Sequence, residues 1–200
     1  MFQLGRKQKL IVVKTVEFGV YLGEDQNASM DERVLLPKKQ VPENCNIGDT
    51  IEVFLYKDSK DRLIATTNIP KLMVGEVGFL TVSQVTKIGA FLDWGLEKDI
   101  LLPYKEQTRK VKEGEEILVA LYIDKSSRLA ATMNVYEYLR KDSNYQKNDM
   151  VTGMIYQTSD NFGVFVAVDN IYSALIPKKE VVGELRIGDT VHARVTGVKP

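Results

Sequence analysis

The stretch Phe18-Gly19-Val20-Tyr21 decides the fold of this chain, because its pattern recurs twice further along the sequence. An apolar pair followed by proline comes next, and a glycine followed by an acid lies eleven residues after that proline. The later copies keep the same order: Ile88-Gly89-Ala90-Phe91, Leu101-Leu102-Pro103 and Gly114-Glu115, then Phe162-Gly163-Val164-Phe165, Leu175-Ile176-Pro177 and Gly188-Asp189. In the first copy the second and third landmarks are Leu35-Leu36-Pro37 and Gly48-Asp49. Three landmarks that recur in the same order and at similar spacing predict a tandem array of one small domain.

The landmarks divide the chain into three repeats, which we expect to fold as separate small domains over residues 1–69, 70–142 and 143–200. Five strands are predicted in repeat one: 9–14, 16–23, 34–36, 50–56 and 62–66. Repeat two shows the same five: 77–86, 88–94, 100–102, 117–123 and 128–132. Repeat three shows four: 149–158, 162–168, 173–176 and 189–198.

The arginine that begins the fifth strand would fall beyond Pro200, so we expect the third domain to be incomplete in this chain. We interpret the chain as a fragment; a natural truncation patched by a partner strand is the alternative.

Alternation within the strands predicts which side chains face the core. In the fourth strand of repeat one, Ile51, Val53 and Leu55 share one face, and Glu52, Phe54 and Tyr56 share the other, which we expect to face outward. The inner face of the matching strand in repeat two is predicted to hold Ile117, Val119, Leu121 and Ile123. By the same parity Trp94 belongs to the core or its rim.

Five strands with a short helical turn after the third predict an all-β chain of small Greek-key barrels of the oligonucleotide/oligosaccharide-binding (OB) type. An SH3-like barrel is the alternative, and the glycine-centred first hairpin favours the OB type. Between repeats two and three, residues 134–141 predict a short linker helix capped by Asn134, with Tyr138 and Leu139 available for packing.

Composition narrows the function classes. Basic and acidic residues number 27 each, and they balance within each repeat: ten of each, then eleven, then six. A partner with negative charge would therefore have to be bound by a local face. No stretch is apolar enough for a membrane span, and Cys45 is the only cysteine, so a cytoplasmic protein is expected.

The landmarks resemble the S1 RNA-binding domain, most clearly at Lys87-Ile88-Gly89-Ala90-Phe91-Leu92-Asp93. Three such repeats resemble the conserved virulence factor B family of bacterial RNA-binding regulators, in which a winged-helix domain follows the S1 units. The resemblance implies single-stranded RNA as the partner, a post-transcriptional regulatory role and a winged-helix domain outside this chain. One departure is that proline stands where S1 domains often carry a histidine in the third strand.

A barrel of this type binds single strands by stacking bases on aromatic rings and by holding phosphates with cations. The aromatic candidates flank the glycines: Phe18, Tyr21, Phe91, Phe162 and Phe165. Further candidates follow the prolines: Lys38, Lys39, Tyr104, Lys105, Lys178 and Lys179. Arg62 and Arg128 each follow an aspartate by four residues, and each could contact phosphate or hold its own turn.

An enzyme, a metal site and a cofactor site find no support in the sequence. His192 is the only histidine, so a Ser-His-Asp set could use no other. It aligns with Glu52 on an outward face, where we expect a plain surface residue. No glycine-rich phosphate loop and no metal-ligand spacing is present. The rival class is a protein-interaction scaffold of degenerate barrels, which the neutral charge favours.

Overall fold

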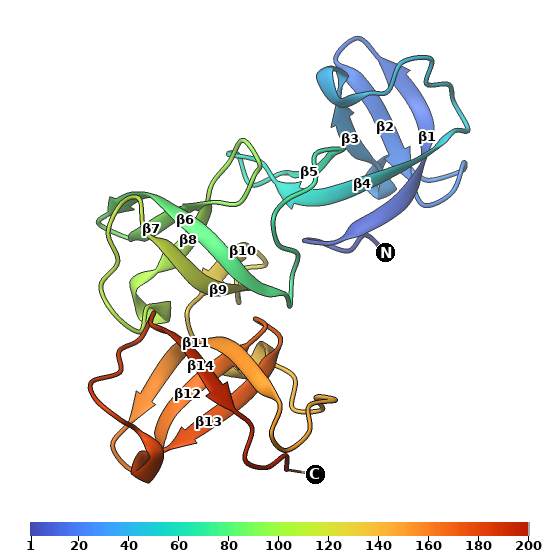
Figure 1. Ribbon diagram of the computed structural model, residues 1–200. Helices are drawn as coiled ribbons and strands as arrows, with labels where there is room; N and C mark the ends of the chain where they lie inside the picture. The colour runs from blue at the N-terminus through green and yellow to red at the C-terminus, as the bar shows by residue number, and fades with distance from the viewer. Residues whose placement is uncertain (200) are drawn as a thin grey trace. The chain divides into compact units, whose positions relative to one another are not determined.

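The computed structural model describes residues 1–199, in which the regular secondary structure consists of strands and short 3-10 helices (Figure 1). These residues pack as two compact bodies. The N-terminal body joins residues 1–74, 93–100 and 122–130, and the C-terminal body joins residues 75–92, 101–121 and 131 onward. The predicted all-β fold is confirmed.

Repeat one is a closed five-stranded barrel in the order β1-β2-β3-β5-β4, with β3 and β5 parallel. Its strands are β1 (Lys7–Val16), β2 (Gly19–Gly23), β3 (Val34–Pro37), β4 (Thr50–Lys57) and β5 (Leu63–Thr66). Alternate side chains from these strands fill the barrel, among them Leu22, Leu36 and Leu55, which are fully buried. This arrangement is the predicted OB barrel.

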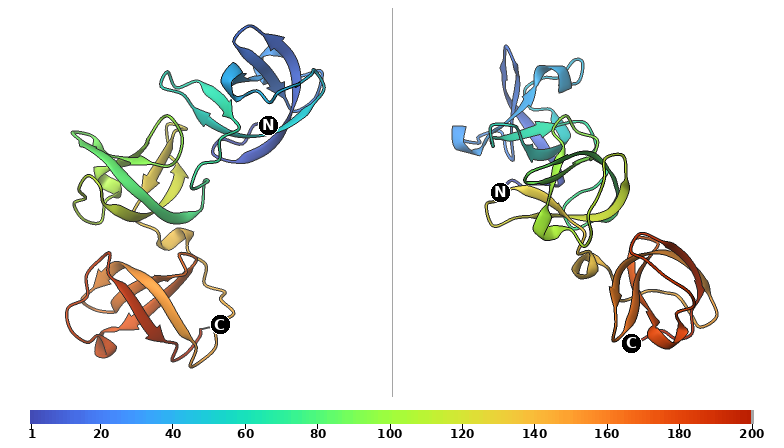
Figure 2. Two further views of the ribbon diagram at one scale, coloured as in Figure 1. Left: turned by 45° about the horizontal axis from the view of Figure 1, so that its top comes forward. Right: turned by 90° about the vertical axis from the view of Figure 1, so that its left-hand side faces the viewer.

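Repeats two and three repeat the strand pattern. The second sheet has the order β10-β9-β6-β7-β8: β6 (Val77–Thr86), β7 (Gly89–Asp93), β8 (Ile100–Pro103), β9 (Glu116–Ile123) and β10 (Leu129–Thr132). The third has the order β13-β12-β11-β14: β11 (Met150–Ser159), β12 (Gly163–Val168), β13 (Tyr172–Pro177) and β14 (Thr190–Arg194). Within the described residues the third sheet has four strands, as expected, and it curls around its own apolar side (Figure 2).

The glycine and proline landmarks touch each other. Gly19 pairs with Pro37, and Gly163 with Pro177, across the second and third strands. A Cβ on Gly19, Gly89 or Gly163 would lie under 3.0 Å from the carbonyl oxygen of the residue before the proline. All three glycines also have φ between +120° and +152°, which side chains other than hydrogen rarely tolerate. The two sequence landmarks are therefore the two sides of one close backbone contact.

The glycine-acid landmark is a turn held against the first strand. Gly48 donates its backbone N–H to the Val12 carbonyl at 2.8 Å, and Val12 donates back to the Asp49 carbonyl at 2.9 Å. Gly188 and Asp189 make the same pair of bonds with Ile155, at 2.8 and 2.9 Å. These bonds fix the start of the fourth strand on the first.

Some residues predicted to face outward are buried. Phe54 is only 1% exposed, because the Trp94 ring packs edge-on against it with 5.6 Å between centroids. Leu118, on the outer face of β9, is buried in a cluster with Leu139 and Tyr156. Conversely, Ile123 is 43% exposed, so its prediction as an inner residue was wrong. The outer face of the fourth strand is a packing surface in repeats one and two.

The predicted linker helix over residues 134–141 is shorter than expected, a three-residue 3-10 turn at Tyr136–Tyr138. Leu139 is already extended, with φ −87° and ψ 140°. Arg140 then leaves the turn to bridge the edge of β13: its N–H donates to Ile171 at 2.7 Å and its carbonyl accepts from Ser173 at 2.9 Å. Pairing with a strand edge ends the helix, while Leu139 packs into the neighbouring cluster as predicted.

The close glycine contact makes a prediction about stability. Gly89→Ala should lower the free energy of unfolding by about 3 kcal/mol or more, because it combines left-handed backbone strain with a backbone clash. Gly114→Ala is the matched control, since Gly114 has φ +82° and nothing within 4 Å of a Cβ. It should cost only about 1–2 kcal/mol. Equal losses in urea unfolding would show that the clash contributes nothing.

Candidate nucleic-acid interface

The predicted basic residues lie on a 3-10 turn that begins at each landmark proline. The turns are Lys38–Gln40, Tyr104–Glu106 and Lys178–Glu180. Each proline has φ near −60°, which ends the strand and directs the chain into the turn. The side chains on the turns are exposed at Lys38, Lys39, Tyr104, Lys105, Lys178 and Lys179. Each repeat thus places a short turn with exposed basic or aromatic side chains beside its glycine hairpin.

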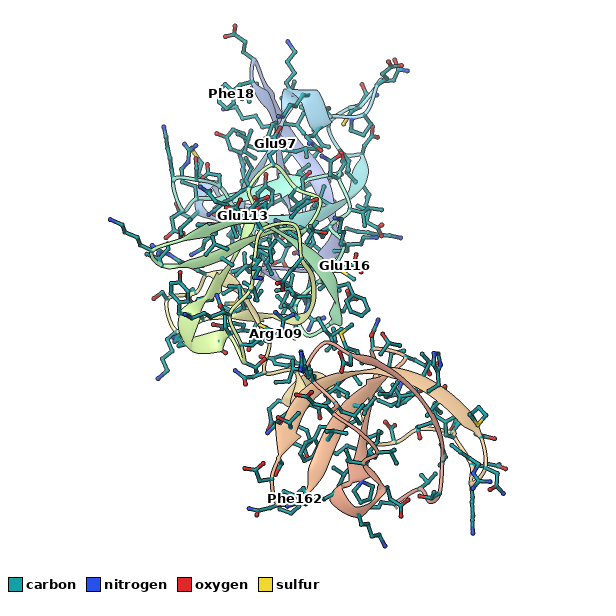
Figure 3. All side chains as sticks on the ribbon, turned by 60° about the vertical axis from the view of Figure 1, so that its left-hand side comes forward. Phe18, Glu97, Arg109, Glu113, Glu116 and Phe162 are labelled. Carbon is teal, nitrogen blue, oxygen red and sulfur yellow. The ribbon has the colours of Figure 1, made fainter. Side chains whose placement is uncertain are left out.

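An exposed aromatic ring stands beside two of these turns. Phe18 is 57% exposed and Phe162 is 63% exposed, each at the tip of its hairpin (Figure 3). Their carbonyls accept the N–H of the first turn residue, Lys38 at 2.9 Å and Lys178 at 3.0 Å. Repeat two has Ile88 at this position, 62% exposed, so it lacks the ring. Repeats one and three therefore unite an accessible ring with a basic turn.

The aromatic residues within the strands differ among the repeats. Tyr21 is half-buried and meets Phe18 edge-on, with 6.4 Å between the ring centroids. Phe91 is also half-buried. Phe165 was expected to face outward, and it does, but Tyr136 and Tyr156 pack against it at 6.4 and 6.2 Å. Its ring is part of a packed cluster, so the structure does not leave it free for stacking.

Tyr21 also belongs to a row of outward side chains that sequence reasoning missed. Strand register places Lys14 beside Tyr21, and Tyr21 beside Leu35. Leu35 is paired with Ile64, and Ile64 with Tyr56. The parallel pairing of β3 with β5 creates this row, and nothing local in the sequence indicated that pairing. The outer face of barrel one thus carries a continuous apolar and aromatic surface that begins at a lysine.

Several predicted cations already have partners. Lys39 forms an ion pair with Glu97, and Lys178 donates to the Asp160 carbonyl at 2.8 Å. The Tyr104 hydroxyl donates to the Thr86 carbonyl at 2.6 Å, which ties its turn to the hairpin. Of the predicted lysines, Lys38, Lys105 and Lys179 show neither an ion pair nor a side-chain hydrogen bond within residues 1–199.

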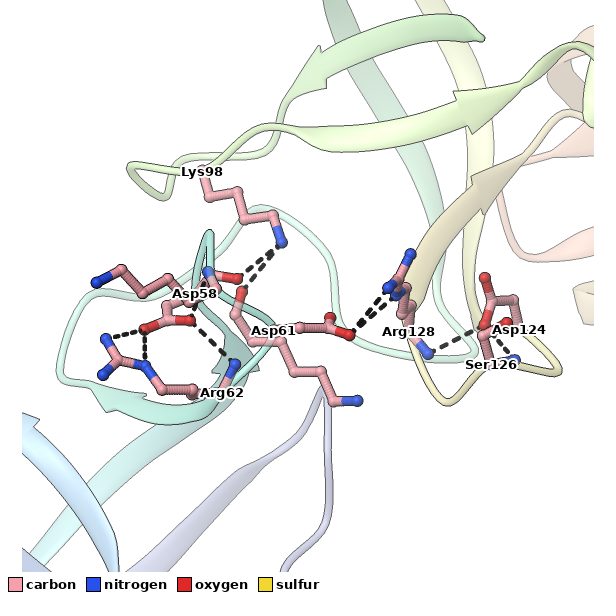
Figure 4. Close-up of polar contacts among 9 residues, drawn as sticks. Asp58, Asp61, Arg62, Lys98, Asp124, Ser126 and Arg128 are labelled. Carbon is pink, nitrogen blue, oxygen red and sulfur yellow. Dashed lines mark hydrogen bonds and ion pairs between the residues drawn. The ribbon is translucent and has the colours of Figure 1, made fainter.

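Both predicted arginines hold loops within the N-terminal body (Figure 4). Arg62 binds the Asp58 carboxylate through two nitrogens, at 3.0 and 2.7 Å, and so holds its own turn. Arg128 does not pair with Asp124 through its side chain; it contacts Asp61 at 3.0 Å, in the β4–β5 loop of repeat one. Lys98, which was not predicted, donates to the Asp58 carbonyl at 3.0 Å. The β4–β5 loop is thus fixed by two side chains from repeat two.

The Asp58 carboxylate is the centre of this loop. Burial raises its pKa, but hydrogen bonds from Arg62 and from the Lys60 backbone outweigh burial and hold the pKa below its ordinary value of 3.8. Within the described residues no cluster of three or more histidine, cysteine or acidic side chains could hold a metal ion. His192 is exposed and bonds Thr152 at 2.8 Å, as expected for a surface residue. The structure describes no helix with the length and hydropathy of a bilayer span.

Comparison with known proteins places the first two repeats in the S1 domain family, to which this chain belongs. The S1 domain family matches residues 4–68 and 74–134. A Bacillus subtilis protein, "Uncharacterized protein YitL", is 28% identical over 206 residues that cover 98% of this chain and 66% of the relative. Conserved virulence factor B of Staphylococcus aureus is 28% identical over 163 residues, which cover 76% of this chain and 53% of the relative. The chain therefore spans less than two thirds of the length of these relatives.

A solved structure shares the fold. It is a multidomain protein with nucleic acid binding domains from Streptococcus pneumoniae, similar with a TM-score of 0.58 and 23% sequence identity. The similarity covers 98% of this chain and 74% of that one.

The lowered pKa of Asp58 predicts a pH-dependent stability. The Asp58→Asn variant should unfold at lower urea concentration than wild type near pH 6, with a loss of about 1–3 kcal/mol from the charged hydrogen bonds. The difference should hold above pH 3.8 and vanish as the pH falls through the lowered native pKa, because protonation removes the same bonds from wild type. Asp160→Asn is the control, at an exposed carboxylate outside the loop. A difference that does not change with pH would contradict the assignment.

Proposed function

We propose that this chain, which belongs to the conserved virulence factor B family of proteins with tandem S1 domains, binds single-stranded RNA. Membership of that family supports a nucleic-acid-binding role. The observation that carries the finer proposal is the exposed ring beside a basic turn: Phe18 beside the turn that carries Lys38, and Phe162 beside the turn that carries Lys179. Single-stranded nucleic acid needs both features, a π-face for each base and a cation near each phosphate.

In this proposal the predicted residues divide into two roles. Bases stack on the exposed or half-exposed rings of Phe18, Tyr21, Phe91 and Phe162. Phosphates contact the lysines that have no partner, which are Lys38, Lys105 and Lys179. The remaining predicted residues position this surface: Lys39, Arg62, Tyr104, Arg128, Phe165 and Lys178. Few free cations and few rings in each repeat imply weak binding by a single repeat. We infer that the repeats at residues 1–69, 70–142 and 143–200 act together through effective concentration.

A regulatory role follows as a proposal from the family. The family resemblance implies post-transcriptional control, and we propose that role in a bacterial cytoplasm. The winged-helix domain implied by the resemblance would lie in the part of the relatives that this chain does not span. The proposed chemistry is binding alone, and the residues described above need no catalytic step.

A protein-interaction scaffold remains the second candidate, because Lys39, Arg62 and Arg128 are paired with acids on the surface. Such a surface would attract a polyanion weakly. Salt dependence separates the two classes, since only RNA binding releases condensed counterions.

Stacking can be tested with ring deletions. The Phe18→Ala/Phe162→Ala variant should bind a uridine oligomer about tenfold more weakly for each base that loses its ring, because one stacked base contributes about 1–3 kcal/mol. Ile88→Ala, at the matching position of repeat two, should bind like wild type. Fluorescence anisotropy measures both affinities. Equal affinity of the double variant and wild type would remove the stacking proposal.

Phosphate contact can be tested through the salt slope. Lys38→Gln should reduce the slope of log K against log salt by about 0.7, the value for one phosphate contact on a single strand. Lys39→Gln is the matched control on the same turn, and it should change the slope less, because Glu97 already neutralises Lys39. Unchanged slopes in both variants would favour the scaffold.

A further inference from the structure

The N-terminal body contains a pocket that sequence analysis did not predict. Its volume is about 440 Å³, within the range of small-molecule sites. Its walls come from the β3 end, the 3-10 turn after it, β4, β5 and two residues of repeat two: Pro37, Lys39, Tyr56, Ile64, Glu97 and Lys98. All of them belong to one compact body.

One wall of the pocket is apolar and contains an aromatic ring. Tyr56 is half-buried, and its ring meets Trp94 edge-on with 6.4 Å between centroids at 80°. Burial raises the pKa of the Tyr56 hydroxyl, so this side chain stays neutral at physiological pH. Ile64 and Pro37 extend the apolar wall. Such a surface suits a planar ring more than an extended chain.

The charged side chains in the wall already have partners. Glu97 pairs with Lys39, and Lys98 donates to the Asp58 carbonyl at 3.0 Å. The Asp58 carboxylate is held by Arg62. A charged ligand would have to break the Lys39–Glu97 ion pair or draw the Lys98 ammonium away from the Asp58 carbonyl, whereas a neutral ligand keeps both contacts. Backbone and side-chain groups at the rim remain as hydrogen-bonding partners for a polar edge, among them the exposed Ser59.

The pocket continues the outward row of barrel one. Tyr21 leads through Leu35 to Ile64 by strand register, and Ile64 lines the pocket. A strand whose bases stack on Phe18 and Tyr21 would therefore reach the pocket along one face of the sheet. A neutral, flat and partly polar group on that path is a nucleobase.

We propose that this pocket holds one unstacked base of the bound RNA strand. The inference rests on the proposed function and deepens it: Glu97 and Lys98 of repeat two complete a base site on the barrel of repeat one. Base identity would be sensed there by the rim groups, while the row beside it only stacks. A single barrel cut before residue 97 would lack that wall.

A filling substitution tests the pocket in the full chain. Ser59→Phe places a ring at the rim, and Ser126→Phe makes the same change in the matching loop of repeat two, outside the pocket. The probe is the shortest uridine oligomer that saturates wild type, with one abasic position moved along it. Wild type should lose about tenfold in affinity at each abasic position whose base stacks on a ring or enters the pocket. Ser59→Phe should bind the intact oligomer about tenfold more weakly and show no further loss at one of these positions, the one whose base enters the pocket.

The outcomes separate this inference from the proposed function. Ser126→Phe should keep the wild-type abasic profile. If Ser59→Phe keeps it as well, while Phe18→Ala/Phe162→Ala weakens binding, the pocket is not a base site and RNA binding stands. If wild type itself does not bind the oligomer, the proposed function fails first. Fluorescence of Trp94, the only tryptophan, checks that each variant is folded.

Discussion

The contact between a glycine backbone and the carbonyl before a proline determines most of what each repeat presents. Gly19 lies so close to the Leu36 carbonyl that a Cβ has no room, and Gly163 repeats this against Ile176. The contact joins the second and third strands, sets the residue before the glycine at an exposed hairpin tip, and brings the turn after the proline beside it. The proposed RNA surface is thus positioned by a contact that involves no side chain, which explains why the flanking residues vary between phenylalanine and isoleucine while the geometry persists.

A second constraint distinguishes the repeats: what covers the outer face of the fourth strand. In repeat one Phe54 packs against Trp94, and in repeat two Leu118 packs against Leu139 and Tyr156. The matching positions of repeat three, His192 and Arg194, are exposed and polar. In arrays of small domains each outer face is apolar only where something packs on it. The substitutions at this one face therefore record packing within the array, and they carry no information about the ligand.

The sequence was informative wherever structure depends on local pattern. Strand positions, the inward parity of Val20 and Leu22, and the burial of Trp94 followed from alternation and from the repeated glycines. It failed where distant segments meet. Phe54 has the parity of a surface residue, and only the fold brings Trp94 over it. Likewise Arg128 lies four residues from Asp124, which suggested a local ion pair, but its guanidinium forms an ion pair with Asp61 instead. Helix signals at residues 134–141 were overridden because Arg140 pairs with the edge of β13.

The balanced charge of each repeat has a physical meaning at this surface. Arg62, Arg128 and Lys39 are bound to acids and hold the β4–β5 loop and the turn beside it in place. A single exposed ion pair contributes little to the free energy of folding. A network of such pairs around one loop is therefore better explained by its effect on the position of the loop than by its contribution to stability. Cations used in this way no longer attract phosphate at long range, so affinity would have to come from stacked rings, from a few free lysines and from linkage between repeats. Binding of that kind favours strands long enough to contact more than one repeat, and it discriminates by strand length and flexibility before it discriminates by sequence.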